Sequence, residues 1–361
     1  KGQVSYKQNS SSYRGYSPAY KLTSTDQKLT NEVTQNMTTG WDWQIENTLS
    51  YTFNIEKHNF DVLVGQSFKK SGFGMGEYLE ATANDLLFSD WDRAYISNSM
   101  DSQPTSAKGY PTGDNALASF FGRINYGYKD KYLAEVTLRY DGSMNFAPGH
   151  RWGLFPAFSL GWVMSEEKFF EPIKDVVSFF KLKGSWGMMG NDNIAAYQFM
   201  SQYKFLADNK GPYFGAGEDG HINQGFYQAR VANPVVTWEK AKTLNLGLST
   251  QFLNGKFGLD FDWFHSNRND ILCYRNASIP YYAGMTLPQE NIGEVTNSGI
   301  EIIATYRDRA GDFEWGITGN LTYAKNKVNY MDEAASTPAW QKTEGHPIDG
   351  QVLLSLIHIS E

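Results

Sequence analysis

Aromatic residues gather in three polar stretches of the chain, and they are the side chains best suited to hold a ligand. An aromatic ring offers a flat apolar face on which a sugar ring or a peptide side chain can stack, and a Tyr hydroxyl adds a hydrogen bond. Packing within the stretches explains the same residues equally well. We predict substrate contacts for Trp91, Tyr95 and Tyr110 in the first stretch, for Tyr213, Phe214, Phe226 and Tyr227 in the second, and for Tyr281 and Tyr282 in the third.

Common signatures of catalysis and metal binding are absent from the sequence. It contains no Gly-rich phosphate loop, no HExxH or CxxC pattern and no Gly-x-Ser-x-Gly elbow. The adjacent Glu166 and Glu167 do not flank a scissile bond as a glycosidase requires, and we interpret them as a solvated turn. The run 191–193 lacks the spacing of a calcium loop, and the formal net charge of −7 gives no broad basic surface for nucleic acid. We therefore predict neither an enzyme nor a protein that binds a metal, a cofactor or nucleic acid.

The elements that would position these residues are long strands. Segment 41–55 alternates apolar residues at odd positions with polar residues at even ones, interrupted only at Asn47. A tilted strand needs about 9 to 11 residues to cross a hydrocarbon core, whereas strands of soluble proteins centre on about 5 or 6. The mean hydropathy of −0.49 and the lack of any run of about 18 apolar residues exclude a membrane protein built of helices. Similar alternation predicts strands near 1–7 and at 60–69, 115–128, 132–141, 151–164, 179–189, 236–252, 257–270, 298–307 and 313–327.

The strand predicted at 132–141 shows how its two faces differ. Apolar residues occupy the even positions from Tyr132 to Tyr140, while Glu135 and Arg139 lie at odd positions. Charged side chains need water, so we expect Glu135 and Arg139, together with Arg123, to line a water-filled lumen, and the apolar face to contact lipid. In the lumen these charges would contact a plug or a translocating solute, or would simply be solvated.

The connections between the predicted strands alternate between short and long. Tight links fall at 56–59, 129–131, 253–256 and 308–312, and we expect Asn254 and Gly255 to form a two-residue type I′ turn. The link 165–178 is intermediate and could hold a helical turn. Short turns on one side and long loops on the other are typical of an antiparallel meander across a membrane. We predict an all-β transmembrane barrel, with a soluble antiparallel sheet packed on a core as the alternative. The long loops would be 70–114, 142–150, 190–235, 271–297 and the region after 327.

Several ordered strings resemble the central barrel of SusC-like (SusC/RagA-type) TonB-dependent transporters. The resemblance covers most of the region 115–327. The strings run from Phe120 to Tyr126, Tyr132 to Leu133, Leu138 to Ser143, Phe155 to Trp162, Leu182 to Gly187, Trp238 to Lys240, Asn245 to Leu248, Asn291 to Val295 and Asn297 to Glu301, with Phe169, Gly190 and Asn191 between them.

The resemblance implies import of nutrients across the bacterial outer membrane. It implies a SusD-type surface lipoprotein that captures an oligosaccharide, or less often a peptide, and energy delivered by the TonB–ExbB–ExbD complex through a plug domain. No plug and no TonB-contacting segment can be recognised, so we expect a fragment with roughly half of a barrel of about 22 strands. A TonB-dependent receptor for a siderophore or other metal chelate, and a soluble carbohydrate-binding β-protein, are the alternatives.

The two ends of the chain carry separate expectations. The chain begins at Lys1 without an initiator Met or a signal peptide, as expected of a fragment. The tail 354–361 loses the alternation and resembles translated sequencing-adaptor sequence. We therefore assign residues 1–353 to the partial barrel and interpret 354–361 as an artefactual tail.

Overall fold

The computed structural model describes residues 1–111, 114–206, 213–214, 221–222, 225–275, 287–334 and 336–348. The tail predicted to be artefactual lies outside these residues. No helix in this described part is both long and apolar enough to span a membrane. Strands dominate the described residues, so the predicted all-β class is confirmed.

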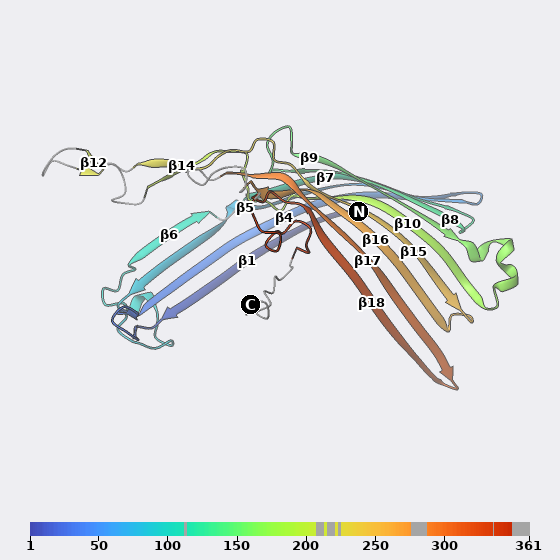
Figure 1. The fold of residues 1–361 in the computed structure, drawn as a ribbon, viewed down its shortest axis with the longest axis horizontal. Helices are drawn as coiled ribbons and strands as arrows, with labels where there is room; N and C mark the ends of the chain where they lie inside the picture. Colours follow the sequence, from blue (N-terminus) through green and yellow to red (C-terminus); the bar gives the residue numbers. More distant parts are fainter. Residues whose placement is uncertain are drawn as a thin grey trace, which may run out of the picture. The chain divides into compact units, whose positions relative to one another are not determined.

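Eleven long strands form an antiparallel meander, in the order β1-β4-β5-β7-β8-β9-β10-β15-β16-β17-β18, and β6 pairs with β5 beside this path (Figure 1). The predicted meander is confirmed. Their bounds are β1 Gly2–Ser17, β4 Glu32–Ile55, β5 His58–Asn84, β6 Ser106–Pro111, β7 Asp114–Tyr128, β8 Tyr132–Ser143, β9 Trp152–Val163, β10 Val177–Asn191, β15 Glu239–Phe252, β16 Phe257–Tyr274, β17 Gln289–Ala310 and β18 Phe313–Tyr330. The short strands are β2 Tyr20–Lys21, β3 Gln27–Lys28, β11 Gln202–Phe205, β12 Tyr213–Phe214, β13 His221–Ile222 and β14 Phe226–Arg230.

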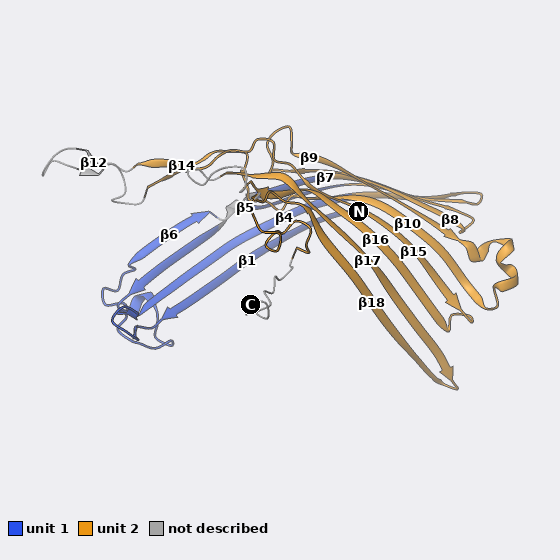
Figure 2. Cartoon of the chain, in the orientation of Figure 1, with its two compact units in different colours: residues 1–47, 66–118 blue, residues 48–65, 119–361 orange. Residues whose placement is uncertain are grey.

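The chain divides into two compact units (Figure 2). Unit 1 contains residues 1–47 and 66–118, and unit 2 contains residues 48–65 and 119–361. Three strands, β4, β5 and β7, contribute residues to both units.

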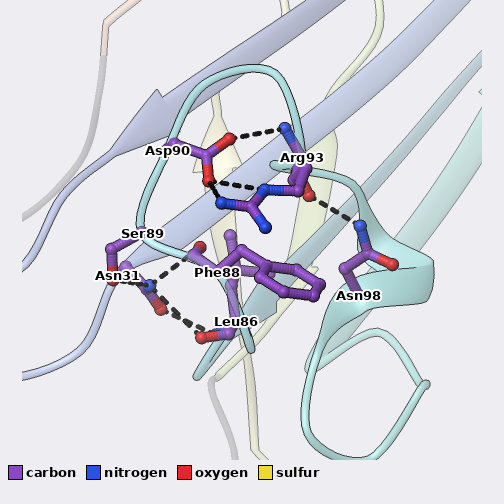
Figure 3. Close-up of polar contacts among 7 residues, drawn as sticks. All are labelled: Asn31, Leu86, Phe88, Ser89, Asp90, Arg93 and Asn98. Atoms are coloured by element: carbon purple, nitrogen blue, oxygen red, sulfur yellow. Dashed lines mark hydrogen bonds and ion pairs between the residues drawn. The ribbon is translucent and has the colours of Figure 1, made fainter.

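In unit 1, a loop packs on the sheet through one buried asparagine. The Asn31 side chain accepts the Leu86 N–H at 2.6 Å and donates to the carbonyl oxygens of Leu86 and Phe88 at 3.3 and 3.4 Å (Figure 3). Val33 and Ala94 are fully buried beside it, in a small core with Ala83 and Leu86. Because a buried amide is costly unless it is hydrogen-bonded, Asn31 specifies one position for this loop.

In unit 2, strand register places the apolar residues of successive strands on one face. Val136 lies opposite Phe158, and Phe158 lies opposite Trp186. On the next strands Leu246 lies opposite Trp263, and Trp263 lies opposite Ile300. Since side chains alternate along a strand, the charged positions fall together on the opposite face.

Two aromatic rows bound this apolar face in unit 2. Tyr140 stacks on Trp152 with ring centroids 4.7 Å apart, and Tyr132 stacks on Trp162 at 6.4 Å. Trp152 and Trp162 are ten residues apart on β9, which is about 34 Å along a strand and about 25 Å across the membrane at the usual tilt of a barrel strand. This spacing matches the apolar band of an outer-membrane barrel.

The short turns include one correction to the sequence analysis. Phe252 pairs with Phe257, which leaves four connecting residues instead of the expected two. The Gly255 N–H donates to the Phe252 carbonyl at 3.1 Å, and the residues between them, Leu253 and Asn254, have φ of 51° and 58°. The prediction of a two-residue turn at Asn254 and Gly255 was therefore wrong, because the positive-φ pair sits one residue earlier and Gly255 adds a third positive φ of 86°.

Several strands extend beyond the predicted ends. β5 continues to Asn84, inside the loop predicted at 70–114, and β16 and β17 extend into the loop predicted at 271–297. β1 also runs to Ser17, far beyond the expected piece near 1–7. Strand extensions beyond the lipid need no continuous apolar face, so the period-two pattern ends before the backbone pairing does.

The link between β9 and β10 contains the expected helical turns, at Met164–Glu166 and Lys168–Ile173. Glu166 is exposed in this link, as interpreted, whereas Glu167 is only partly exposed. Its carboxylate accepts the Tyr132 hydroxyl at 2.7 Å and the Trp162 indole N–H at 3.3 Å, and it pairs with Lys131 at 3.3 Å. These donors, the Tyr132 hydroxyl first, hold the pKa of Glu167 below its usual value.

Candidate lumen wall and ligand-binding loops

The charged face of unit 2, the candidate lumen wall, carries a row of polar side chains that crosses several strands. Glu135 lies opposite Ser159, Ser159 lies opposite Ser185, and Ser185 lies opposite Asn245 across four neighbouring strands. A depression of about 590 Å³ in this wall is lined by residues of β4, β5, β7, β8, β9, β10, β15 and β16. Such a wall can offer hydrogen bonds and charge to a polar surface or solute.

One ion pair crosses the depression and was not predicted from the sequence. Lys183 of β10 pairs with Asp262 of β16 at 2.8 Å, over the backbone of Gly247 on β15. A Cβ at Gly247 would lie 2.1 Å from the Asp262 carboxylate and 2.7 Å from the Lys183 side chain. Glycine at 247 therefore leaves the room in which the pair forms. No sequence signal joins residues 79 positions apart, so only the strand order reveals the pair.

The three predicted wall residues lie on strands of unit 2 at polar positions. Arg139 pairs with Asp141 at 3.0 Å, and its guanidinium lies 5.2 Å from the centre of the Phe121 ring. Arg123 lies 3.9 Å from Asp61, and Glu135 accepts the Thr137 hydroxyl at 3.5 Å. The structure thus gives each of the three residues a protein partner, while the role of these residues toward a plug or solute stays a prediction.

Above the wall, the loops of unit 2 are tied together at the strand ends by residues of the family-like strings. Trp238 is buried between Phe146 and Phe155, with ring centroids 5.2 Å apart in both cases, and its indole N–H donates to the Arg151 carbonyl at 2.9 Å. The Asn291 side chain bridges the backbone of Thr237 and the carbonyl of Asp270.

Asp192 belongs to the same network and gives the run 191–193 a structural role. Its carboxylate accepts the Ser143 hydroxyl at 2.7 Å, and its carbonyl accepts the Asn145 side chain at 3.0 Å. Among the residues that the structure describes, no three His, Cys, Asp or Glu side chains are grouped closely enough to hold a metal ion. Three residues of the family-like strings, Ser143, Trp238 and Asn291, therefore anchor loops at this end of the strands.

In unit 1, two of the aromatic residues predicted to contact substrate make cation–π contacts with an arginine of the protein. The Arg14 guanidinium lies 4.5 Å from the Trp91 ring centre and 4.2 Å from that of Tyr95, at a cavity of about 960 Å³. Such cation–π contacts stabilise the loop against β1. Arg14 was missed because it falls outside the strand predicted near 1–7.

Tyr110 is not part of this cluster. It pairs with Tyr78 across β5 and β6, with ring centroids 4.9 Å apart. Side chains alternate along β5, so Leu79 and Ala83 share one face and Tyr78 lies on the other. Ala83 packs in the core beside the loop that carries Trp91. The three aromatic residues of the first stretch therefore lie on two faces of the sheet.

In unit 2, a hairpin of β11 and β14 carries four exposed aromatic residues. Phe226 and Tyr227, both predicted, lie on β14 and are 67% and 48% exposed. Tyr203 and Phe205 on β11, which the sequence analysis missed, are 61% and 70% exposed. Phe205 pairs with Phe226, and the rings of Tyr203 and Phe226 meet edge to face at 6.1 Å.

The remaining predicted contacts cannot be placed in the same way. Tyr213 and Phe214 form strand β12, which pairs with β13, and only their backbone lies within the described structure. Tyr281 and Tyr282 lie outside the described residues.

Comparison with known proteins identifies the family. The family model described as "TonB dependent receptor-like, beta-barrel" matches residues 1–352. The TonB-dependent receptor SusC of Bacteroides thetaiotaomicron is 30% identical over 309 residues, covering 81% of this chain and 28% of SusC. The TonB-dependent receptor P26 of Formosa agariphila is 31% identical over 293 residues, covering 79% of this chain and 28% of the receptor. The chain thus spans little more than a quarter of the length of these relatives.

Solved structures share the fold. The RagAB peptide importer in its closed-closed state superposes with a TM-score of 0.75 at 20% identity, covering 96% of this chain and 37% of that one. Its open-open state gives a TM-score of 0.73 at 20% identity, covering 91% and 34%. The family match, the membrane-length strands and the two-faced sheet agree: the chain belongs to the TonB-dependent receptor β-barrel family, whose members are outer-membrane receptors and transporters and not enzymes.

Proposed function

We propose that this chain forms part of the barrel wall and capture loops of a SusC-type importer, which moves an oligosaccharide, or less often a peptide, across the outer membrane. A SusD-type surface lipoprotein would deliver the substrate, and TonB would supply the energy through a plug. The similarity to SusC along 81% of the chain carries this proposal. The row of polar side chains across unit 2 supports it, because a lumen that holds a plug and passes a polar solute needs polar groups on its wall.

The exposed hairpin of β11 and β14 supports the choice of a glycan. Its aromatic rings lie at the long-loop ends of the strands and offer apolar faces on which sugar rings can stack. We propose Tyr203, Phe205 and Phe226 as substrate contacts, together with Tyr227. Trp91, Tyr95 and Tyr110 remain proposed contacts in unit 1, although each already contacts another side chain of the protein.

Growth of a deletion strain tests the function. The gene that encodes this chain is deleted, and growth is compared on purified oligosaccharides, on peptides and on chelated iron, with and without TonB. We expect a defect on one class of oligosaccharide that complementation repairs only when TonB is present. A defect confined to peptides would change the substrate class, and one confined to chelated iron would favour the siderophore-receptor alternative.

Two substitutions test the hairpin in the complemented strain. Tyr203→Ala and Phe226→Ala should raise the oligosaccharide concentration needed for half-maximal uptake and leave the amount of receptor in the membrane unchanged. Leu253→Ala, at an exposed turn residue on the opposite ends of the strands, is the matched control. Uptake that is equally insensitive to all three substitutions would remove the hairpin from the proposal.

A further inference from the structure

The link between β9 and β10 differs from the other short-end connections of unit 2. It spans residues 164–176 and forms two short helical segments, whereas β7–β8, β15–β16 and β17–β18 are joined by tight turns. We call residues 164–176 the short-end segment. Three of its apolar residues are largely exposed: Phe169 at 62%, Ile173 at 49% and Val176 at 59%.

Two neighbouring phenylalanines attach the short-end segment to the apolar face of the sheet. Phe170 is 4% exposed and packs on Phe180 with ring centroids 6.0 Å apart. Phe169 meets Trp162 edge to face at 6.3 Å. Phe180 and Trp162 both belong to the apolar face, because Leu182, two positions after Phe180, lies opposite Trp162. The segment therefore lies on the lipid side of the sheet.

The depth of the short-end segment relative to the membrane follows from the aromatic row that the segment extends. Tyr128, Tyr132 and Trp162 form consecutive ring contacts at 6.3 and 6.4 Å, and Phe169 continues this series. Aromatic rows of this kind lie at the boundary between hydrocarbon and headgroups. The three donors on Glu167 fix the segment at that level.

The charges of the segment identify the kind of surface it fits. Glu166 pairs with Lys174 at 3.1 Å, while Lys168, Glu171 and Asp175 lie exposed. Acidic residues outnumber basic ones, so attraction to anionic lipid cannot drive contact. Contact with the membrane can instead be driven by insertion of the apolar side chains beside the aromatic row.

We propose that the short-end segment is a membrane-interface anchor, in which Phe169, Ile173 and Val176 insert among the phospholipids of the leaflet at the short-turn ends of the strands. This inference goes beyond the proposed import function and does not depend on the substrate. Its ligand is a phospholipid bilayer of neutral or mixed charge.

Spin labels placed along the segment test the anchor in the outer-membrane protein that carries this chain. Cysteines at 169, 173, 174 and 176, each with Cys273→Ser, are labelled with a nitroxide and reconstituted in vesicles of phosphatidylethanolamine and phosphatidylglycerol. The collision rates with oxygen and with a water-soluble nickel complex are then compared. Labels at Val136 and Asn254 provide the lipid and water references.

We expect the oxygen-to-nickel ratio at 169, 173 and 176 to shift from the value at 254 toward that at 136, whereas 174 stays close to 254. The fraction of anionic lipid should leave the shift unchanged. Labels at 173 and 176 keep the test valid if the label at 169 disturbs the ring contact with Trp162. Nickel access at 173 and 176 equal to that at 254 would overturn the anchor, and so would a shift that requires anionic lipid.

Discussion

At the scale of single residues, neighbouring positions along a strand lie on opposite faces of the sheet. Val136 lies midway between Tyr132 and Tyr140 on the apolar face, and Thr137 follows it on the polar face. An Arg on the lipid face near the midplane of a barrel costs about 2 to 4 kcal/mol. Because the two residues share the same depth, they form a matched pair.

We therefore expect Val136→Arg to lower the free energy of unfolding of the full receptor by about 2 to 4 kcal/mol, and Thr137→Arg to lower it much less. Denaturant titration in lipid vesicles measures both values. Equal losses for the two variants would contradict the assignment of the faces.

Glu167 gives a prediction that depends on pH. Its hydrogen bonds hold the folded-state pKa below the ordinary carboxyl value, so the contribution to stability is present above that value, about 4.3, and is lost as the pH falls through the lower folded pKa. Glu167→Gln should lower the thermal unfolding midpoint at pH 7, and the difference from the natural protein should shrink below about pH 4. Heat-modified migration on gels after incubation at each pH measures the midpoint, and a difference that is constant down to pH 2 would speak against the hydrogen-bonded carboxylate.

Residue types and spacing predicted the faces of the strands but few of the side-chain partners. Glu135 and Arg139 lie on the polar face as expected, because alternation is a local property. The ion pair of Lys183 with Asp262 depends on the order of the strands in the sheet. The separation of Tyr110 from Trp91 depends on which face of the sheet each side chain occupies. Neither property is encoded in neighbouring residues.

At the scale of elements, the sequence predicted the number and order of the long strands because each crosses the membrane with a period-two pattern. The strand lengths predicted from the sequence were too short, most of all for β5 and β17. The period-two pattern appears only where one face of a strand contacts an apolar environment. The turn at 253–256 was also misplaced, since the turn composition alone does not reveal register.

The position of the turns and loops leads to a topology prediction. Met100 and Met200 are exposed in long connections, whereas Lys57 and Asp312 lie in tight turns. With Cys273 replaced by Ser, cysteines at 100 and 200 should react with an impermeant maleimide on intact cells, and cysteines at 57 and 312 only after permeabilisation. Labelling of all four positions on intact cells would contradict a membrane meander, and the reverse pattern would invert the orientation.

At the scale of the whole chain, the meander that the described residues form ends at β1 and β18, and each of these end strands has only one partner. Unpaired backbone groups inside a bilayer cost several kcal/mol each, so closure into a barrel is required. We expect residues 1–361 produced alone to aggregate or misassemble and to give no TonB-dependent uptake in a strain that lacks the full receptor. TonB-dependent growth supported by residues 1–361 alone would show that the chain is functionally sufficient.

The meander also has a consequence for the order in which the strands assemble. Within unit 2, β15 and β16 are joined by four residues, whereas 47 residues separate β10 from β15. Closing the longer connection costs about 2 kcal/mol more chain entropy. We therefore expect the strands β7 to β10 and the strands β15 to β18 to form as two separate groups, and the pairing of β10 with β15 to follow. Trp238, just before β15, packs on Phe146 and Phe155 from the other side of this connection, so we expect its buried contacts to form with the joining of the two groups.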